Sequence, residues 1–336
     1  MNSNQRIFYY DFLRAFAIFA VILCHVDGII GYSFWNLKVA IPGLLTTIAL
    51  TGVPIFFMLS GALLLNRKYS LKEFYKKRFS RIFYPFLFWM IISIIIGILY
   101  LNWTKIDALN VFFGITSHTW YIWVLIGIYL IIPIINSFSK EYGLKGLEFF
   151  LIIWIITILF NSYCPHYLKT LELSYFSGYI GYVILGYYLD NKKFKFSDEK
   201  MFYIGTFIFI LFTLVHMIIF YRMIKFYSDY YLNIITLLQS TGLFIMIKYL
   251  DIISLNTKNL FSKIKTNKMG KIILSISLCS YGMYLNHYII IEYFKQFNLH
   301  SLKALFAILI ITIFLSWFST YLCSKIPYIE KFSGVK

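Results

Sequence analysis

The stretch Tyr10–Gly28 reads YDFLRAFAIFAVILCHVDG and places an arginine, Arg14, and a histidine, His25, inside an otherwise apolar run. The run is long enough to cross a bilayer, which takes about 20 residues of helix. Ionisable side chains inside a membrane are costly, and where they persist they usually face the protein interior and have a function. The stretch therefore predicts a first membrane helix, near residues 10–32, with a functional polar face.

The spacing of these two side chains puts them on one face of the predicted helix. Arg14 and His25 are eleven residues apart, which leaves them about 20° apart around the axis and roughly 16 Å apart along it. Asp11 lies one turn before Arg14 on the same face and is placed to pair with it. We therefore expect a polar stripe of Asp11, Arg14 and His25 that runs from the membrane edge inward.

The composition is that of a polytopic membrane protein. Of 336 residues, 60% are hydrophobic, 21% are aromatic and only 13% are charged, and the mean hydropathy is +0.75, well above the range of soluble domains. The formal net charge of +17 comes from short clusters of lysine and arginine between apolar runs. Such clusters are typical of cytoplasmic loops, so the charge indicates topology and no nucleic-acid partner.

The cysteines give no evidence of a disulfide framework or a structural metal site. The sequence has four, they are scattered, and none forms a C-x-x-C pair; they are Cys24, Cys164, Cys279 and Cys323. Closely spaced pairs are the pattern that disulfide scaffolds and zinc sites require. No metal is expected.

Ten apolar segments predict an all-α membrane protein with about ten transmembrane helices. They lie near residues 10–32, 43–65, 82–102, 119–138, 147–163, 175–190, 201–221, 230–250, 271–294 and 303–323. Most lysine and arginine residues fall near the N-terminus, at 66–81, 139–146, 191–200 and 251–270, and at the C-terminus, which predicts that both termini are cytoplasmic. We expect a single transmembrane domain over residues 1–336, with basic loops at 66–81 and 251–270 and no appended soluble domain.

The second segment has a composition that breaks or kinks a helix. It reads IPGLLTTIALTGVPIFFMLSGALLL and carries Gly52, Pro54 and Gly61 within its apolar length. Broken helices at membrane depth are tolerated where they line a cavity, and Ser60 with Gly61 would allow a ligand to approach the backbone closely. The alternative is a proline kink that only improves packing.

The densest positive charge in the chain precedes the third segment. The stretch SLKEFYKKRFSRIFYP contains Arg78 and Arg81 one turn apart, together with Lys72, Lys76 and Lys77. Guanidinium groups bind phosphate in a bidentate manner, so the two arginines are candidate ligands for a phosphorylated substrate. A topological anchor or a contact with anionic lipids would show the same pattern.

Two further stretches carry polar groups at membrane depth. His118 and Trp120 open the fourth segment, SHTWYIWVLIGIYLIIPII, where an aromatic belt is the alternative explanation. The ninth segment, SISLCSYGMYLNHYIIIEYF, holds His287 about sixteen residues from its cytoplasmic end, close to the expected depth of His25. His287 is therefore a candidate functional residue, or else makes a structural hydrogen bond between helices.

These motifs together resemble the acyltransferase-3 family of integral membrane O-acyltransferases. The resemblance rests on Arg14-(ten residues)-His25 in the first helix, VPIFFMLSGALLL in the second, R-x-x-R before the third, His-x-Trp in the fourth and SYGMYLNH in the ninth. It implies transfer of an acyl group from cytoplasmic acyl-CoA, with acetyl-CoA as the expected donor, to hydroxyl groups of a cell-surface or lipid-linked polysaccharide. Glycan-assembly proteins are expected partners.

The resemblance also implies roles for individual residues. The catalytic candidates are His25, Arg14 and His287, because a histidine has the pKa that a base for the hydroxyl proton needs. Arg14, Arg78, Arg81 and Ser60 are expected on the donor side, and His118 and Trp120 on the acceptor side. The chain is similar to stand-alone surface polysaccharide O-acetyltransferases of the enterobacterial common antigen type, which implies a multi-pass protein of the bacterial plasma or inner membrane.

A transporter or flippase for a lipid-linked saccharide is the main alternative, since it would also have many helices, a broken helix and buried polar groups. The sequence has no convincing inverted repeat, and a membrane scaffold without activity would not need the stripe of Arg14 and His25. Hydrolysis or exchange of labelled acetyl-CoA would distinguish an enzyme from a transporter.

The distribution of positive charge predicts the topology. Reporter fusions should place both termini, the 66–81 segment and the 251–270 segment in the cytoplasm, because lysine and arginine are retained on that side. Activity of cytoplasmic and periplasmic reporters at each position measures this. A periplasmic 66–81 segment would contradict the expected entry of the donor from the cytoplasm.

Overall fold

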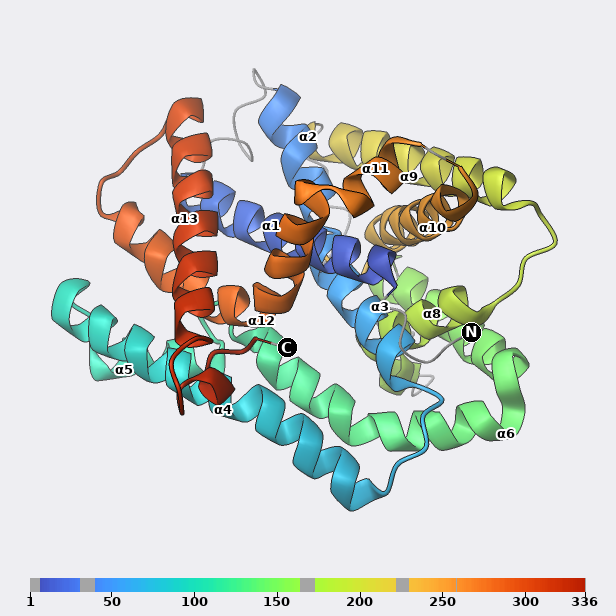
Figure 1. The fold of residues 1–336 in the computed structure, drawn as a ribbon, viewed down its shortest axis with the longest axis horizontal. Helices are drawn as coiled ribbons and strands as arrows, with labels where there is room; N and C mark the ends of the chain where they lie inside the picture. The colour runs from blue at the N-terminus through green and yellow to red at the C-terminus, as the bar shows by residue number, and fades with distance from the viewer. Residues whose placement is uncertain (1–6, 31–39, 164–172, 222–229, 258, 336) are drawn as a thin grey trace. The chain divides into compact units, whose positions relative to one another are not determined.

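A computed structural model describes residues 7–30, 40–163, 173–221, 230–257 and 259–335 of the chain (Figure 1). Every regular element in these ranges is a helix, as the long apolar runs predict. A helix satisfies all its backbone hydrogen bonds within one segment, which is what a bilayer without water demands. The first element, α1, spans Phe8–Ile30 and carries Asp11, Arg14 and His25.

The second apolar segment is broken, as its composition predicts. It forms α2 (Ala40–Ala49) and α3 (Gly52–Leu64), with a turn at Leu50 and Thr51. Pro54 lies in the first turn of α3, where the missing N–H costs nothing because no carbonyl precedes it in the helix. The buried hydroxyl of Thr51 donates to the carbonyl of Ile48, 2.7 Å away. This hydrogen bond within the segment satisfies both polar groups at the turn.

The third segment begins earlier than hydropathy predicts. α4 spans Leu71–Tyr100, whereas the apolar run predicted 82–102 and a loop over 66–81. A capping box starts the helix: the Ser70 hydroxyl accepts from the N–H of Glu73, and the Glu73 carboxylate accepts from the N–H of Ser70. The expected loop is therefore wrong from Leu71 onward, and the charged stretch with Arg78 and Arg81 is helical.

Two predicted segments with a loop between them form one element. α6 spans Trp120–Tyr163, where 119–138, a loop at 139–146 and 147–163 were expected. Gly143 alone within it has non-helical backbone angles, φ 60° and ψ −154°, a conformation that glycine adopts without a steric cost. The predicted loop is thus reduced to a kink at one residue.

The remaining helices overlap the predicted apolar runs, except the first of them, which falls between the predicted segments 82–102 and 119–138. They are α5 (Lys105–Phe113), α8 (Ile180–Asn191), α9 (Asp198–Tyr221), α10 (Ile234–Asn256), α12 (Lys268–Lys295) and α13 (Leu302–Cys323), with 3₁₀ turns at Leu173–Phe176 and Glu330–Phe332 (η2). The expected 251–270 linker is largely helical, because α10 continues to Asn256 and a short helix, α11 (Leu260–Thr266), follows.

Seven helices in the described residues are long and apolar enough to cross a membrane, fewer than the ten predicted segments. The difference has three sources: α6 joins two segments, α8 has only 12 residues, and α12 is long enough but is not among the seven apolar spans. The chain is therefore a multi-pass membrane protein whose polar residues are concentrated in particular helices.

The helices form two compact units, each built from separate parts of the chain. Unit 1 contains residues 1–20, 43–66 and 135–277, and unit 2 contains residues 21–42, 67–134 and 278–336. Boundaries fall within α1, α2, α6 and α12, so each of these helices contributes to both units.

Glycines allow two close helix pairs in unit 1. A Cβ on Gly61 of α3 would lie 1.7 Å from the carbonyl oxygen of Val183 in α8, and a Cβ on Gly186 of α8 would lie 2.0 Å from that of Met58. The neighbouring pair, α9 and α10, also lies side by side (Figure 1), where the Gln239 amide donates to Thr213 at 2.8 Å. Small residues and buried amide hydrogen bonds commonly hold membrane helices together.

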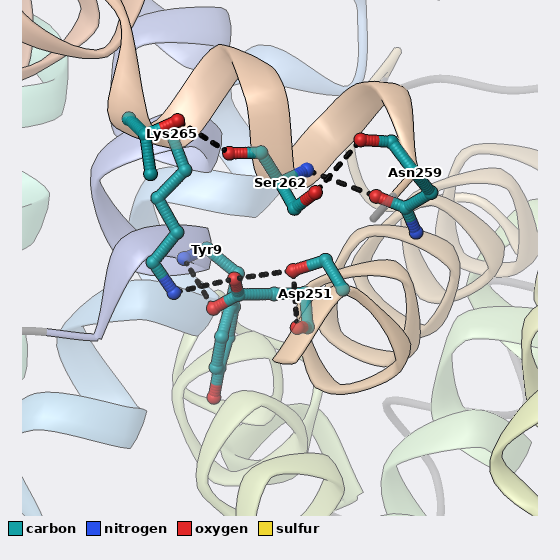
Figure 2. Close-up of polar contacts among 7 residues, drawn as sticks. Tyr9, Asp251, Asn259, Ser262 and Lys265 are labelled. Carbon is teal, nitrogen blue, oxygen red and sulfur yellow. Dashed lines mark hydrogen bonds and ion pairs between the residues drawn. The ribbon is translucent and has the colours of Figure 1, made fainter. Parts of the chain in front are cut away.

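The start of α1 is hydrogen-bonded to the 251–270 segment, for which the sequence predicts a linker. Figure 2 shows Asp251 between two donors: the backbone N–H of Tyr9 at 3.1 Å and the ammonium group of Lys265 at 3.2 Å. Asn259 caps α11 by accepting from the N–H of Ser262 at 2.9 Å, which directs Lys265 toward Asp251. The basic segment thus stabilises unit 1.

In unit 2 the C-terminal turn packs against α4. The Trp89 indole donates to the carbonyl of Ser333 at 3.0 Å, and Phe88 stacks on Phe332 of η2 with centroids 6.2 Å apart. The Tyr281 hydroxyl of α12 donates to the carbonyl of Ile82 at 2.8 Å. These contacts join α4, α12 and the C-terminal segment.

The α3–α8 pair predicts a glycine whose replacement is costly. Gly186→Ala should lower the melting temperature of the purified protein, because its Cβ would meet the backbone of Met58; overpacking of this kind costs about 1–3 kcal/mol. Gly127→Ala in α6 is the matched control, since nothing lies within 4 Å of the added atom. An unchanged melting temperature in Gly186→Ala would contradict the packing of α3 on α8.

Candidate functional site

The N-terminal half of the predicted stripe takes part in a hydrogen-bond network in unit 1. Arg14 and Asp11 are 3.5 Å apart, as predicted, and Ser277 of α12 completes the network. The Arg14 guanidinium donates to the Ser277 hydroxyl at 3.1 Å, and that hydroxyl donates to the Asp11 carboxylate at 2.6 Å. Because Asp11 and Ser277 are buried, the network fixes the position of Arg14.

Three histidines from three parts of the chain meet in unit 2. His25 lies on α1, His287 on α12, and His118 in the turn before α6. The ring centroids are 5.0 Å apart for His25 and His287, 4.8 Å for His118 and His287, and 6.2 Å for His25 and His118. Two of these residues are the predicted catalytic histidines, and the third was expected on the acceptor side.

Backbone carbonyls determine which ring nitrogen of His25 and of His287 carries the proton. The Nδ1 of His287 lies 2.7 Å from the carbonyl oxygen of Tyr284, and the Nδ1 of His25 lies 2.8 Å from that of Val21. A carbonyl oxygen only accepts hydrogen bonds, so each neutral ring has its proton on Nδ1. The lone pair of each ring is therefore on Nε2.

The ring of His287 contacts the Nδ1 side of the ring of His25. The Nε2 of His287 lies 3.4 Å from the Nδ1 of His25, so the N–H of His25 faces both the Val21 carbonyl and the lone pair of His287. This leaves the Nε2 of His25 as the basic atom on the far side of its ring. If the Nε2 of His25 takes a proton, the Nδ1–H of the charged ring still faces the Val21 carbonyl and the Nε2 of His287. These two acceptors would orient the ring, as the third group does in a nucleophile–base pair.

His25 is the most accessible of the three histidines. His25 is partly exposed, whereas His118 is 3% exposed and His287 is fully buried. Of these three residues, His25 has the largest accessible surface, and the rings of His118 and His287 pack against it.

Two tyrosines of α12 hold His118 in the cluster. The Tyr284 hydroxyl donates to the backbone carbonyl of His118, and the ring of Tyr288 stacks on its imidazole with centroids 4.9 Å apart and planes at 24°. Tyr288 also donates to the carbonyl of Thr116 at 3.2 Å. The turn before α6 is thus fixed against the same helix that carries His287.

The predicted phosphate-binding arginines lie on the first turns of α4 in unit 2. Arg78 is half-buried and lines a cleft at this end of the helix, whereas Arg81 is exposed and is not among the residues that line it. The guanidinium carbon of Arg78 lies 6.0 Å from the ring centroid of Phe74. Arg14 belongs to the other unit.

Ser60 and Trp120, the other two predicted site residues, contact residues that are close to them in the sequence. The Ser60 hydroxyl donates to the carbonyl of Phe56 at 2.9 Å, and the close approach at Gly61 is made by the backbone of α8. This favours the packing explanation for the glycines of the second segment. Trp120 is partly exposed at the start of α6, with its ring 6.2 Å from that of Tyr121.

Sequence reasoning missed the residues that position the predicted ones. Ser277 carries no signal, since a serine in a membrane helix usually bonds its own backbone. Tyr284 lies within the quoted motif SYGMYLNH, three residues before His287 and hence on the same helix face, so helical spacing could have identified it.

Comparison with known families identifies the domain to which the chain belongs. The model of the acyltransferase-3 family, described as an acyltransferase domain, matches residues 7–321. No curated protein and no solved structure matches the chain. The matched region includes the Arg14 network, the histidine cluster and the basic start of α4.

The carbonyl contacts predict the tautomers of His25 and His287. In protein labelled with ¹⁵N-histidine, both residues should give the nitrogen shifts of the Nδ1–H form, because both Nδ1 atoms face carbonyl oxygens. Spectra of His25→Gln and His287→Gln assign the signals by difference. An Nε2–H signal for neutral His25 would contradict the assignment of its basic atom.

Proposed function

The chain belongs to the acyltransferase-3 family, and we propose that it is a membrane O-acyltransferase that moves an acetyl group from cytoplasmic acetyl-CoA to a hydroxyl of a cell-surface or lipid-linked polysaccharide. Its activity is then that of a surface polysaccharide O-acetyltransferase of the enterobacterial common antigen type. The bacterial plasma or inner membrane is the compartment that gives access to both substrates.

One observation carries the proposal: His25 presents an Nε2 lone pair on an accessible ring whose opposite nitrogen is held by Val21 and His287. A hydroxyl group is a weak nucleophile until a base takes its proton, and histidine is the side chain suited to this near neutral pH. The orientation of the ring by two acceptors matches what such a base requires.

The proposed acetyl transfer has two steps. The Nε2 of His25 takes the hydroxyl proton as the oxygen attacks the thioester carbonyl, and a C–O bond forms. The C–S bond then breaks, and the thiolate of coenzyme A receives the proton from His25 and leaves as the thiol. A transient acyl group on the same Nε2 would use the same lone pair and the same exposed side of the ring.

Arg14, Arg78, Arg81 and Ser60 are assigned to the donor. Coenzyme A carries several phosphate charges at its nucleotide end, and guanidinium groups are the strongest partners for them. The hydrogen bonds of Arg14 to Asp11 and Ser277 favour a fixed position for its charge. Ser60 is the weakest member of this set, because its hydroxyl bonds to Phe56.

His287, His118 and Trp120 complete the assignment. His287 acts through His25 and is a positioning residue, because it is fully buried. His118 and Trp120, at the start of α6, are assigned to the acceptor side, with His118 shaping the wall behind His25. Trp120 is exposed enough to contact a sugar ring, and aromatic side chains commonly stack on sugar faces.

Replacement of the proposed base tests this function. His25→Ala should reduce the rate of acetyl transfer by at least about a hundredfold, the usual contribution of a general base, while the protein remains folded and inserted. The measurement is acetyl transfer from labelled acetyl-CoA by purified protein in liposomes.

The matched control is His300→Ala, which removes an exposed histidine before α13 and should leave the rate unchanged. Substantial transfer by well-folded His25→Ala protein would end the assignment of His25 as the base.

A further inference from the structure

A groove in unit 1 lies between the second half of α6, α8 and α10. Its volume is about 350 Å³, within the range of ligand sites. Trp154 and Leu237 are buried parts of its lining, whereas Ile152 and Ile155 are exposed. Because α6 is one of the helices apolar enough to cross a membrane, these exposed side chains face lipid, and the groove is reached from the bilayer.

The polar groups inside the groove are already hydrogen-bonded within the protein. The Thr241 hydroxyl donates to the carbonyl of Leu237 at 2.8 Å, and the Trp154 indole donates to the carbonyl of Gly178 at 3.0 Å. The rest of the interior is lined by leucine and isoleucine side chains. The groove therefore offers an apolar surface to its occupant, which suits a hydrocarbon chain.

Two opposite charges stand at one end of the groove. Glu148 lines this end together with Tyr188, whose hydroxyl donates to the Glu148 carboxylate at 2.6 Å. The ammonium group of Lys192 lies 2.5 Å from the same carboxylate and 5.5 Å from the ring centroid of Tyr188. The side chains of Glu148 and Lys192 are 36% and 33% exposed, so a polar headgroup can reach both charges.

We propose that the groove holds one acyl chain of phosphatidylethanolamine, with the phosphate of the lipid on Lys192 and its ammonium group on Glu148. An exposed ion pair contributes little stability, so the headgroup can insert between the two side chains and give each an opposite charge. Basic pockets between membrane helices bind anionic headgroups, whereas this end of the groove carries both signs. The proposal does not depend on acyl transfer.

The carboxylate selects among phospholipids. The primary ammonium group of phosphatidylethanolamine donates charge-assisted hydrogen bonds to Glu148. The trimethylammonium group of phosphatidylcholine has no N–H to donate, and phosphatidylglycerol has no cation. Phosphatidylethanolamine should therefore bind about tenfold more tightly than either, a ratio in the range of one charge-assisted hydrogen bond.

The test is the binding of single lipids to the purified full chain in detergent, measured by native mass spectrometry with three phospholipids that share palmitoyl and oleoyl chains. Glu148→Gln should weaken phosphatidylethanolamine binding about tenfold without weakening that of phosphatidylglycerol. Glu141→Gln is the control and should keep the preference, because Glu141 is an exposed acid of α6 that is not among the residues lining the groove.

A second set of variants tests the site of the acyl chain. Ile155→Trp adds bulk inside the groove and should weaken phosphatidylethanolamine binding at least about tenfold. Ile156→Trp should bind like the wild type, because Ile156 is similarly exposed, 39% against 36%, and is not among the lining residues. Leu238→Phe fills the groove from α10 and should repeat the loss, and melting temperatures show that each variant is folded.

Three outcomes would overturn the proposal. Equal binding by the Ile155→Trp and Ile156→Trp proteins would show that lipid covers this face without a site. Tighter binding of phosphatidylglycerol than of phosphatidylethanolamine would make the charged end a general basic site. Tighter binding of a polyprenyl phosphate than of either would assign the groove to a lipid carrier. Because binding is measured without acyl transfer, none of these results bears on the proposed function.

Discussion

The pairing of polar side chains within the protein is the constraint on which this structure depends. A bilayer offers no water to an ionised group, so the residues of α1 that interrupt its apolar run need partners from distant parts of the chain. Asp11 and Arg14 share Ser277 of α12 in unit 1, and His25 meets His287 of α12 and His118 in unit 2. In each unit, α1 and α12 are therefore held together by polar contacts.

The same pairing gives His25 its chemistry. Since the Val21 carbonyl and the Nε2 of His287 both face its Nδ1, the lone pair is left on the accessible side of the ring. His118 and His287 are almost fully buried and pack against the His25 ring. The contacts that satisfy His25 are thus also those that would orient it as the base that we propose.

Hydropathy and spacing predicted the all-helical class, the pair of Asp11 with Arg14, the break in the second segment and the similar depth of His25 and His287, whose rings lie 5.0 Å apart. They failed in two places: the capping box of Ser70 and Glu73 extends α4 through charged residues, and the expected loop at 139–146 is a kink at Gly143 between two helices. The contact of His118 with His25 depends on tertiary packing. Such a long-range contact produces no repeating pattern in the sequence, so spacing could not predict it. The contribution of Ser277 depends on the same long-range contact.

Stoichiometry is the most direct test of the central claim that this is an acyltransferase and not a carrier of saccharides. Purified protein in liposomes would receive acetyl-CoA on the donor side and a saccharide acceptor, with free thiol and alkali-labile acetyl ester measured together. The account predicts one ester formed for each coenzyme A thiol released. Movement of saccharide across the bilayer, with neither thiol release nor ester formation, would contradict it.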